Sequence, residues 1–208
     1  MDVGHSIATQ GVLSARGVPE FEYNLALARD VAAALEKAGL RVRLIGAGGD
    51  VVDLASRPRA ALGADLLISI HHDSIKERML EAWQHEGEPR RYNDGISGFS
   101  LFVSRHNPRL AASLACASAI GQALRANGFT PSRYHADPAL GEGREFADET
   151  NGVHYFDHLA VVRHARMSAL LFEAGVIVNR DEELRMRDPA VKQAIAAALA
   201  QGVAQCLG

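Results

Sequence analysis

Short apolar runs alternate along the chain with longer segments of helical period. The runs at 40–45, 65–70, 99–104 and 169–172 have the length of strands, and residues 2–3 form a further stub. Two of these runs, 65–70 and 169–172, are almost continuously apolar, which is typical of strands covered on both faces. The alternation predicts an α/β fold with one mostly parallel, twisted sheet of about five to six strands and helices on both faces.

Helices are predicted where an apolar stripe lies between residues that favour helix ends. The first begins at Pro19 and ends before Gly39, because proline suits the first helical position and glycine suits a left-handed cap. The second has Asn107 as its N-cap and ends at Gly128, and a third closes the chain. A chain of 208 residues without internal repeats is predicted to form a single domain, 1–208.

Two stretches, 76–97 and 130–157, have no regular period and are predicted to be long loops. The second stretch is rich in polar and ionisable side chains, and two interpretations of it stay open: the wall of a substrate groove, or a solvated surface loop. The side chains concerned are Arg133, His135, Glu142, Arg144, Glu145, Asp148, Asn151 and His154.

Composition and charge exclude several classes of protein. The net charge is -3 with acidic and basic residues interspersed, so nucleic acid is not expected as a partner. No apolar stretch reaches the roughly 18 residues of a bilayer span, so the chain is not expected to cross a membrane. The only two cysteines, Cys116 and Cys206, lie in predicted helices, and neither a disulfide framework nor a cysteine zinc cluster is expected.

The first residues resemble the end of a strand rather than a signal peptide. We therefore expect the sequence to be truncated at its N-terminus. On that interpretation, an export signal would be missing from the sequence, so its absence does not argue for a cytoplasmic protein.

Three ionisable side chains lie at the carboxyl ends of predicted strands. His5 follows the stub, His71 follows the run 65–70, and Glu173 follows the run 169–172. The carboxyl ends of parallel strands share one edge, where open α/β sheets bind ligands, and Glu20 begins the first helix at the same edge. Two histidines and a carboxylate are a known catalytic zinc set. We therefore predict one Zn2+ per chain held by His5, Glu20 and His71, with Glu173 free for proton transfer.

A single histidine at a strand end is more commonly a hydrogen-bonded structural residue, so this prediction depends on the four groups together. His72 is predicted to point to the opposite side of the strand from His71, as a supporting or surface residue. Glu22 is the nearest competitor of Glu20. Two residues along a helix rotate a side chain by about 200°, so Glu22 is predicted to face solvent. Neither a Gly-x-Ser-x-Gly elbow nor a His-Glu-x-x-His motif is present.

Four motifs, in order along most of the chain, resemble the zinc-dependent N-acetylmuramoyl-L-alanine amidases of the type 3 class. They are Asp2-Val3-Gly4-His5-Ser6, then Glu20 with Asn24, Leu25 and Ala28, then Leu54-x-x-Arg57 followed by 64–71, and finally 171–175 followed by Asn179. The chain departs from the family pattern at Ser6, where a glycine is usual, and at His72-Asp73.

The resemblance implies that His5, Glu20 and His71 are the zinc ligands and that Glu173 is the catalytic acid/base. It also implies peptidoglycan or muropeptides as the substrate and cleavage between N-acetylmuramic acid and L-alanine of the stem peptide. The expected location is the cell envelope, periplasmic or extracellular. Two alternatives stay open: a zinc peptidase or carboxypeptidase that acts on other peptides, and a non-catalytic peptidoglycan-binding module. The presence of Glu173 beside three ligands argues against the second.

The helical phase predicts different effects for the two neighbouring glutamates. Glu20→Ala should lose the bound metal, because it removes a ligand that faces the site, whereas Glu22→Ala should keep it. Elemental analysis of the two purified variants measures the difference. Loss of metal from Glu22→Ala alone would reverse the assignment.

Overall fold

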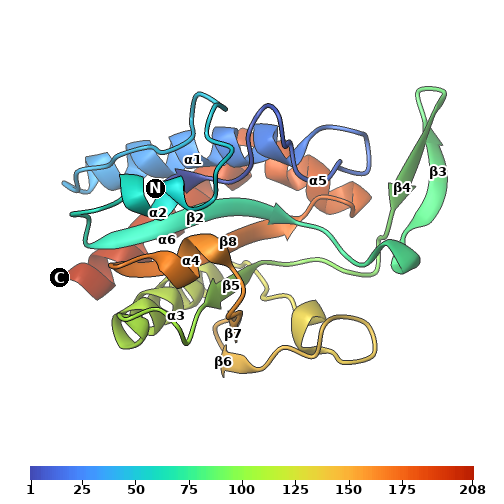
Figure 1. The fold of residues 1–208 in the computed structure, drawn as a ribbon. Helices are drawn as coiled ribbons and strands as arrows, with labels where there is room; N and C mark the ends of the chain where they lie inside the picture. The colour runs from blue at the N-terminus through green and yellow to red at the C-terminus, as the bar shows by residue number, and fades with distance from the viewer.

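The computed structural model describes residues 1–208 and contains a six-stranded sheet in the order β1-β2-β8-β5-β7-β6 (Figure 1). The strands are β1 (Asp2–Val3), β2 (Leu66–Asp73), β8 (Ser168–Val176), β5 (Ser100–Val103), β7 (Val153–Tyr155) and β6 (Phe146–Asp148). β1, β2 and β8 are parallel, β5 is antiparallel to β8 and parallel to β7, and β6 is antiparallel to β7. The predicted α/β fold with a mostly parallel sheet is confirmed, and the three strands expected to carry the site are adjacent and parallel.

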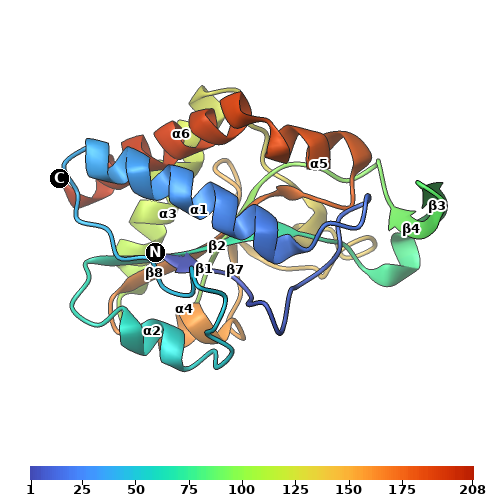
Figure 2. The same ribbon diagram turned by 90° about the horizontal axis from the view of Figure 1, so that it is seen from above.

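Helices cover both faces of the sheet, as Figure 2 shows from above. One face carries α1 (Glu20–Lys37), α3 (Leu110–Ala126), α5 (Arg180–Arg187) and α6 (Pro189–Leu207), and the other carries the short helices α2 (Ser56–Ala60) and α4 (Ala160–His164). The larger apolar core lies under the first group and includes Ile70, Phe172 and Leu199. A smaller core with Leu67 and Leu171 lies under the second. Alternate residues of β2 and β8 therefore serve opposite layers.

The predicted helices form, with small shifts at their starts. α1 begins at Glu20, one residue after Pro19, and the chain leaves it through Gly39 at φ +86°. α3 begins at Leu110 rather than directly after Asn107. The Asn107 side chain accepts a hydrogen bond from Arg109 N at 2.7 Å and donates to Val162 O at 2.9 Å, so it forms a turn ahead of the helix.

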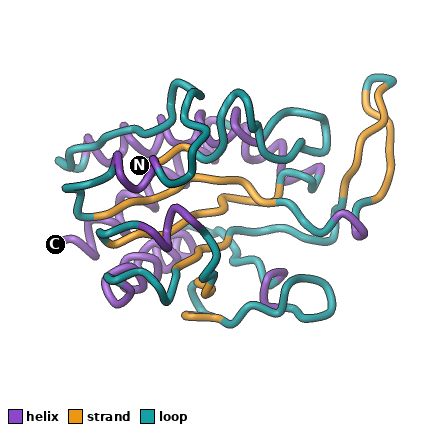
Figure 3. The backbone as a smooth tube through the Cα atoms, in the orientation of Figure 1, coloured by secondary structure: helices purple, strands orange, loops and turns teal.

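The strand predicted at 40–45 is wrong. Only Ile45 bridges to Asp2, since β1 offers two residues for pairing. Conversely, both predicted loops contain strands. β6 and β7 lie in the second, and the first contains a hairpin of β3 (Glu81–His85) and β4 (Glu88–Tyr92), which projects beyond the sheet in Figure 3. Its two-residue turn is Glu86-Gly87, both at positive φ, and a glutamate there gives little sequence signal for a hairpin.

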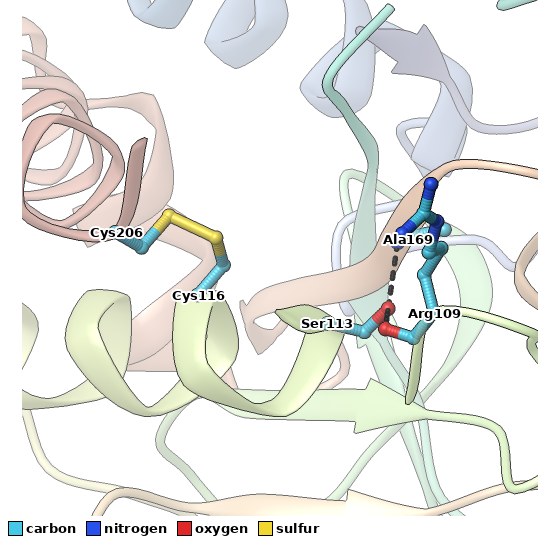
Figure 4. Close-up of a disulfide and its surroundings, with 5 residues drawn as sticks. All are labelled: Arg109, Ser113, Cys116, Ala169 and Cys206. Carbon is cyan, nitrogen blue, oxygen red and sulfur yellow. Dashed lines mark hydrogen bonds between the residues drawn. A yellow bond between two sulfur atoms is a disulfide. The ribbon is translucent and has the colours of Figure 1, made fainter. Parts of the chain in front are cut away.

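The two cysteines form a disulfide, although no disulfide framework was expected (Figure 4). Cys116 of α3 and Cys206 of α6 lie where these helices pack side by side, with their Cα atoms 5.0 Å apart. One turn earlier, Ser113 Oγ accepts a hydrogen bond from Ala169 N at 2.9 Å and so joins α3 to β8. The cross-link closes a sequence separation of 90 residues. None of the helices combines the length and the apolarity of a membrane span.

The disulfide should contribute measurably to stability. Replacing both cysteines with serine should lower the free energy of unfolding by about 3 kcal/mol. The cross-link restricts the conformational entropy of the unfolded chain, and without it the unfolded state becomes more favourable. Urea denaturation of the oxidised wild type and the double variant measures this. The reduced wild type serves as the matched control and should resemble the variant; equal stability of all three would contradict the prediction.

Candidate metal centre and active site

The four predicted residues meet at the carboxyl edge of the three parallel strands. His5 follows β1, His71 and Glu173 are register partners on β2 and β8, and Glu20 is the first residue of α1. The strands bring three of the groups together because β1, β2 and β8 run in the same direction. The start of α1 brings the fourth. Glu22, on the other side of the helix, is exposed.

Glu20 lies between the two histidines. Its Oε2 is 2.8 Å from His5 Nε2, and its Oε1 is 3.0 Å from His71 Nδ1. The two rings are nearly perpendicular, with centroids 5.0 Å apart. Burial alone would raise the pKa of Glu20, but hydrogen bonds with both histidines hold that pKa well below its usual range. The carboxylate is therefore ionised and aimed at the same point as both rings.

Close packing around these side chains requires glycine at two positions. A Cβ on Gly4 would lie 2.4 Å from the His71 ring, and a Cβ on Gly11 would lie 2.4 Å from Glu20 Oε2. Gly11 also has φ +79°, in the region that favours glycine. The loop between β1 and α1 can therefore approach the cluster only because both positions lack a side chain.

A buried amide fixes the position of Glu20. Asn24, one turn along α1, donates from Nδ2 to Glu20 Oε1 at 3.0 Å and to Gly4 O at 3.2 Å. Its Oδ1 accepts from His72 Nδ1 at 2.9 Å, which assigns the proton of that ring to Nδ1. Burial lowers the pKa of His72 to about 3, so the ring stays neutral. His72 is thus a buried support of the site and not a surface residue.

Glu173 contrasts with Glu20 in having no histidine partner. Part of its side chain is open to the cavity, but its Oε2 is buried without a hydrogen-bond partner. Burial, and then the negative charges of Asp73 and Glu20, raise the pKa of Glu173 well above its usual value. A carboxyl group in this environment is suited to proton transfer or to a position beside a cation.

The cluster lies in a cavity of about 450 Å³, whose far wall comes from the segment 134–142. His135 Nε2 is 2.6 Å from Asp73 Oδ2, and its Nδ1 is 3.3 Å from Glu142 Oε2. Lys76 adds a backbone hydrogen bond to the Tyr134 hydroxyl at 2.8 Å. Charge pairing across the cavity therefore attaches this segment to the end of β2.

Of the polar residues predicted to line a groove, only His135 and Glu142 reach the cavity, while Arg144 contacts Glu142 from behind. The others lie outside it. Arg133 pairs with Glu149, Glu145 with Arg105, Asp148 accepts from Asn151, and His154 is buried in β7. A larger cavity of about 610 Å³ lies by the start of β2, but its lining contains no histidine, cysteine or glutamate. The chemistry therefore belongs to the smaller cavity.

The donor set suits a metal ion. One ligand atom from each of His5, Glu20 and His71 lies within 4.8 Å of the others, and imidazole nitrogens with a carboxylate oxygen are typical catalytic zinc ligands. The unpaired Glu173 oxygen in the same cavity also fits, since a nearby cation would compensate its charge. These features fit a metal-dependent hydrolase with its site at the carboxyl edge of an α/β sheet.

Comparison with known families agrees with this class. The family described as N-acetylmuramoyl-L-alanine amidase matches residues 1–205, and the chain belongs to it. The protein is therefore a hydrolase of the amide bond between N-acetylmuramic acid and L-alanine in peptidoglycan. Comparison with curated protein sequences finds no match.

Solved structures of amidases share the fold. The catalytic domain of the N-acetylmuramoyl-L-alanine amidase CwlV from Bacillus (Paenibacillus) polymyxa var. colistinus is 24% identical with a TM-score of 0.73, and the alignment covers 99% of this chain and 95% of that one. The amidase Ami1 of Mycobacterium smegmatis is 20% identical with a TM-score of 0.77, covering 100% and 94%. The N-acetylmuramoyl-L-alanine amidase of Clostridium difficile 630 is 19% identical with a TM-score of 0.76, and the alignment covers 99% of this chain and 94% of that one.

The wall of the cavity should make stability depend on pH. Burial opposes the charge on His135, but the Asp73 and Glu142 carboxylates outweigh it and raise the pKa of His135 to about 9. In the unfolded chain a histidine releases its proton near pH 6.5. The stabilisation is therefore fully present below about pH 6.5 and is lost as pH rises through about 9.

Relative to His135→Gln, the wild type should lose on the order of 2 kcal/mol of unfolding free energy across that range. Urea denaturation at pH 6, 8 and 9.5 measures the difference. His164→Gln, at an exposed position, is the matched control and should show no such trend. A difference between wild type and His135→Gln that does not change with pH would contradict the assignment.

Proposed function

We propose that the protein is a zinc-dependent peptidoglycan amidase in which His5, Glu20 and His71 hold one Zn2+ and Glu173 is the general acid/base. The observation that carries the proposal is the convergence of two imidazoles and one ionised carboxylate beside a second carboxyl that has no partner. The one six-stranded sheet, with the largest apolar core packed on its face, supports the interpretation of 1–208 as one catalytic domain. Because the substrate is a wall polymer, we expect the enzyme to act in the cell envelope, outside the cytoplasmic membrane.

The residues divide the work in a defined way. When bound, a zinc ion supplies a Lewis acid that polarises the scissile carbonyl and acidifies water. His5, Glu20 and His71 provide three donors, and Asn24 holds Glu20 in place through its buried amide. The cavity wall at His135 and Tyr134 limits the space in which a stem peptide can lie beside these groups.

Glu173 supplies the proton transfers. Amide hydrolysis requires that the attacking water lose a proton and that the leaving nitrogen of L-alanine gain one. Glu173 lies at the floor of the cavity in register with His71, so one carboxyl group can serve both steps. Its raised pKa favours holding the proton between the two transfers.

A digest of purified sacculi tests the reaction. The wild type should release stem peptides with a free L-alanine amino group and leave glycan strands with intact lactyl carboxylates, which mass spectrometry identifies. Chelator should abolish this activity and zinc should restore it. Cleavage within the stem peptide instead would indicate a peptidase, and activity unaffected by chelation would contradict the metal assignment.

Glu173→Gln separates proton transfer from metal binding. Glutamine is nearly the same size as glutamate, so the cavity should keep its shape. Turnover should fall by about 10²- to 10⁴-fold, the usual contribution of a general acid/base, while zinc content stays close to that of the wild type. Steady-state digestion and elemental analysis measure the two quantities. His71→Ala is the matched comparison and should lose the metal; near-normal turnover in Glu173→Gln would exclude the proposed mechanism.

A further inference from the structure

The geometry points to Arg57 as a positioning residue that sets the metal affinity of the site by holding His5 in place. The inference rests on the proposed function, since it assumes that His5 is a ligand. Arg57 lies in α2, on the face of the sheet opposite α1, and its side chain touches none of the proposed ligand atoms. Any effect on the metal must therefore pass through the backbone of the β1 segment.

Arg57 is an unusually buried cation, with 2% of its surface exposed. Its Nη1 donates to Asp2 Oδ1 at 2.7 Å and to the carbonyl of Val3. Its Nη2 donates to the carbonyls of His5 and Val51. One guanidinium thus connects both residues of β1, and His5 two residues beyond it, to the 46–55 loop. A buried charge is retained only when it is paired and hydrogen-bonded, and Asp2 supplies the pairing.

The contact with the His5 carbonyl explains the backbone at that residue. His5 has φ +67°, and it is one of only two non-glycine residues in the chain at positive φ. The left-handed region disfavours a side chain with a Cβ, so the conformation persists only where the surroundings impose it. The guanidinium contacts carbonyls on both sides of this turn, at Val3 and at His5 itself. It therefore fixes the bend from which the imidazole is directed at Glu20.

The Arg57 guanidinium and its four acceptors, which we call the Arg57 clamp, are supported by a hydrogen bond from β2. Asp2 Oδ2 accepts a hydrogen bond from Ser69 Oγ of β2 at 2.6 Å, and both side chains are fully buried. Ser69 is also the register partner of Asp2 and lies two residues before His71. The chain of contacts from Ser69 through Asp2 to Arg57 thus links the strand that carries one histidine to the backbone of the other.

Arg57→Lys tests the inference, because lysine keeps the charge but has no planar fork that could reach four acceptors. Residues that orient metal ligands typically change metal affinity by about 10- to 100-fold. We therefore expect zinc to bind at least about 10-fold more weakly, measured by competition with a chromophoric chelator. At full cobalt loading the visible absorption bands should also shift, because the His5 ring is no longer held in the same orientation.

Two further variants complete the design. Ser69→Ala removes only one hydrogen bond to Asp2 and should weaken zinc binding by less than Arg57→Lys, which provides a test even if the lysine variant does not fold. Arg59→Lys is the matched control: Arg59 lies two residues away in the same helix, is exposed and pairs with Asp53. It should bind zinc like the wild type.

The outcomes separate this inference from the proposed function. If Arg57→Lys and Ser69→Ala both bind zinc and give cobalt spectra like Arg59→Lys, even with a lower melting temperature, Arg57 is a structural residue and the inference is wrong. His5→Ala is the reference for the proposed function. If it binds zinc as tightly as the wild type, His5 is not a ligand and the proposed site itself is wrong. Loss of zinc in His5→Ala with no change in the clamp variants overturns only the inference.

Discussion

The carboxylate of Glu20 is the interaction on which the site depends, because one of its oxygens contacts His5, just beyond β1, and the other contacts His71 of β2. This arrangement places the start of α1 directly against the edge of the sheet. The loop before α1 must then pass close to both rings, which leaves no room for side chains at Gly4 and Gly11. Asn24 is buried in turn because it satisfies the same carboxylate from within the helix. The requirements for glycine at positions 4 and 11 and for asparagine at position 24 all follow from the placement of the Glu20 carboxylate.

Concentrated negative charge is the second constraint. Glu20, Glu173, Asp73 and Glu142 line one cavity, and like charges raise the cost of ionising each other. Three of these groups have cationic or imidazole partners, whereas Glu173 has none. A site of this kind is electrostatically incomplete without a cation. His135 of the wall pairs with Asp73 and Glu142, and the cluster of His5, Glu20 and His71 is where the proposed metal ion would add positive charge.

Sequence alone could predict the parallel centre of the sheet and the meeting of the four central residues, because parallel strands that carry His5, His71 and Glu173 at their carboxyl ends must place them on one edge. It could not predict the support around them. The Arg57 clamp depends on contacts with main-chain carbonyls, which carry no sequence signature, and the disulfide depends on how α3 packs against α6. Segment 40–45 looked like a strand because its apolar pattern was real, but its neighbour β1 is too short to pair with it. The Glu86-Gly87 turn has glutamate where asparagine, aspartate or glycine usually marks a hairpin.

The antiparallel direction of β5 has a further consequence for how this enzyme can diversify. Because β5 runs antiparallel to β8, the chain leaves β5 at the end of the sheet opposite the site. It must return through α3 and the residues after it before His135 reaches the cavity. Neither α3 nor the segment after it contributes a member of the His5, Glu20 and His71 cluster. The cluster of His5, Glu20 and His71 and the cavity wall at 134–142 are thus encoded in separate stretches of the chain. Insertions or replacements in the wall can therefore change the shape of the cavity, while the backbone that positions His5, Glu20 and His71 stays as it is.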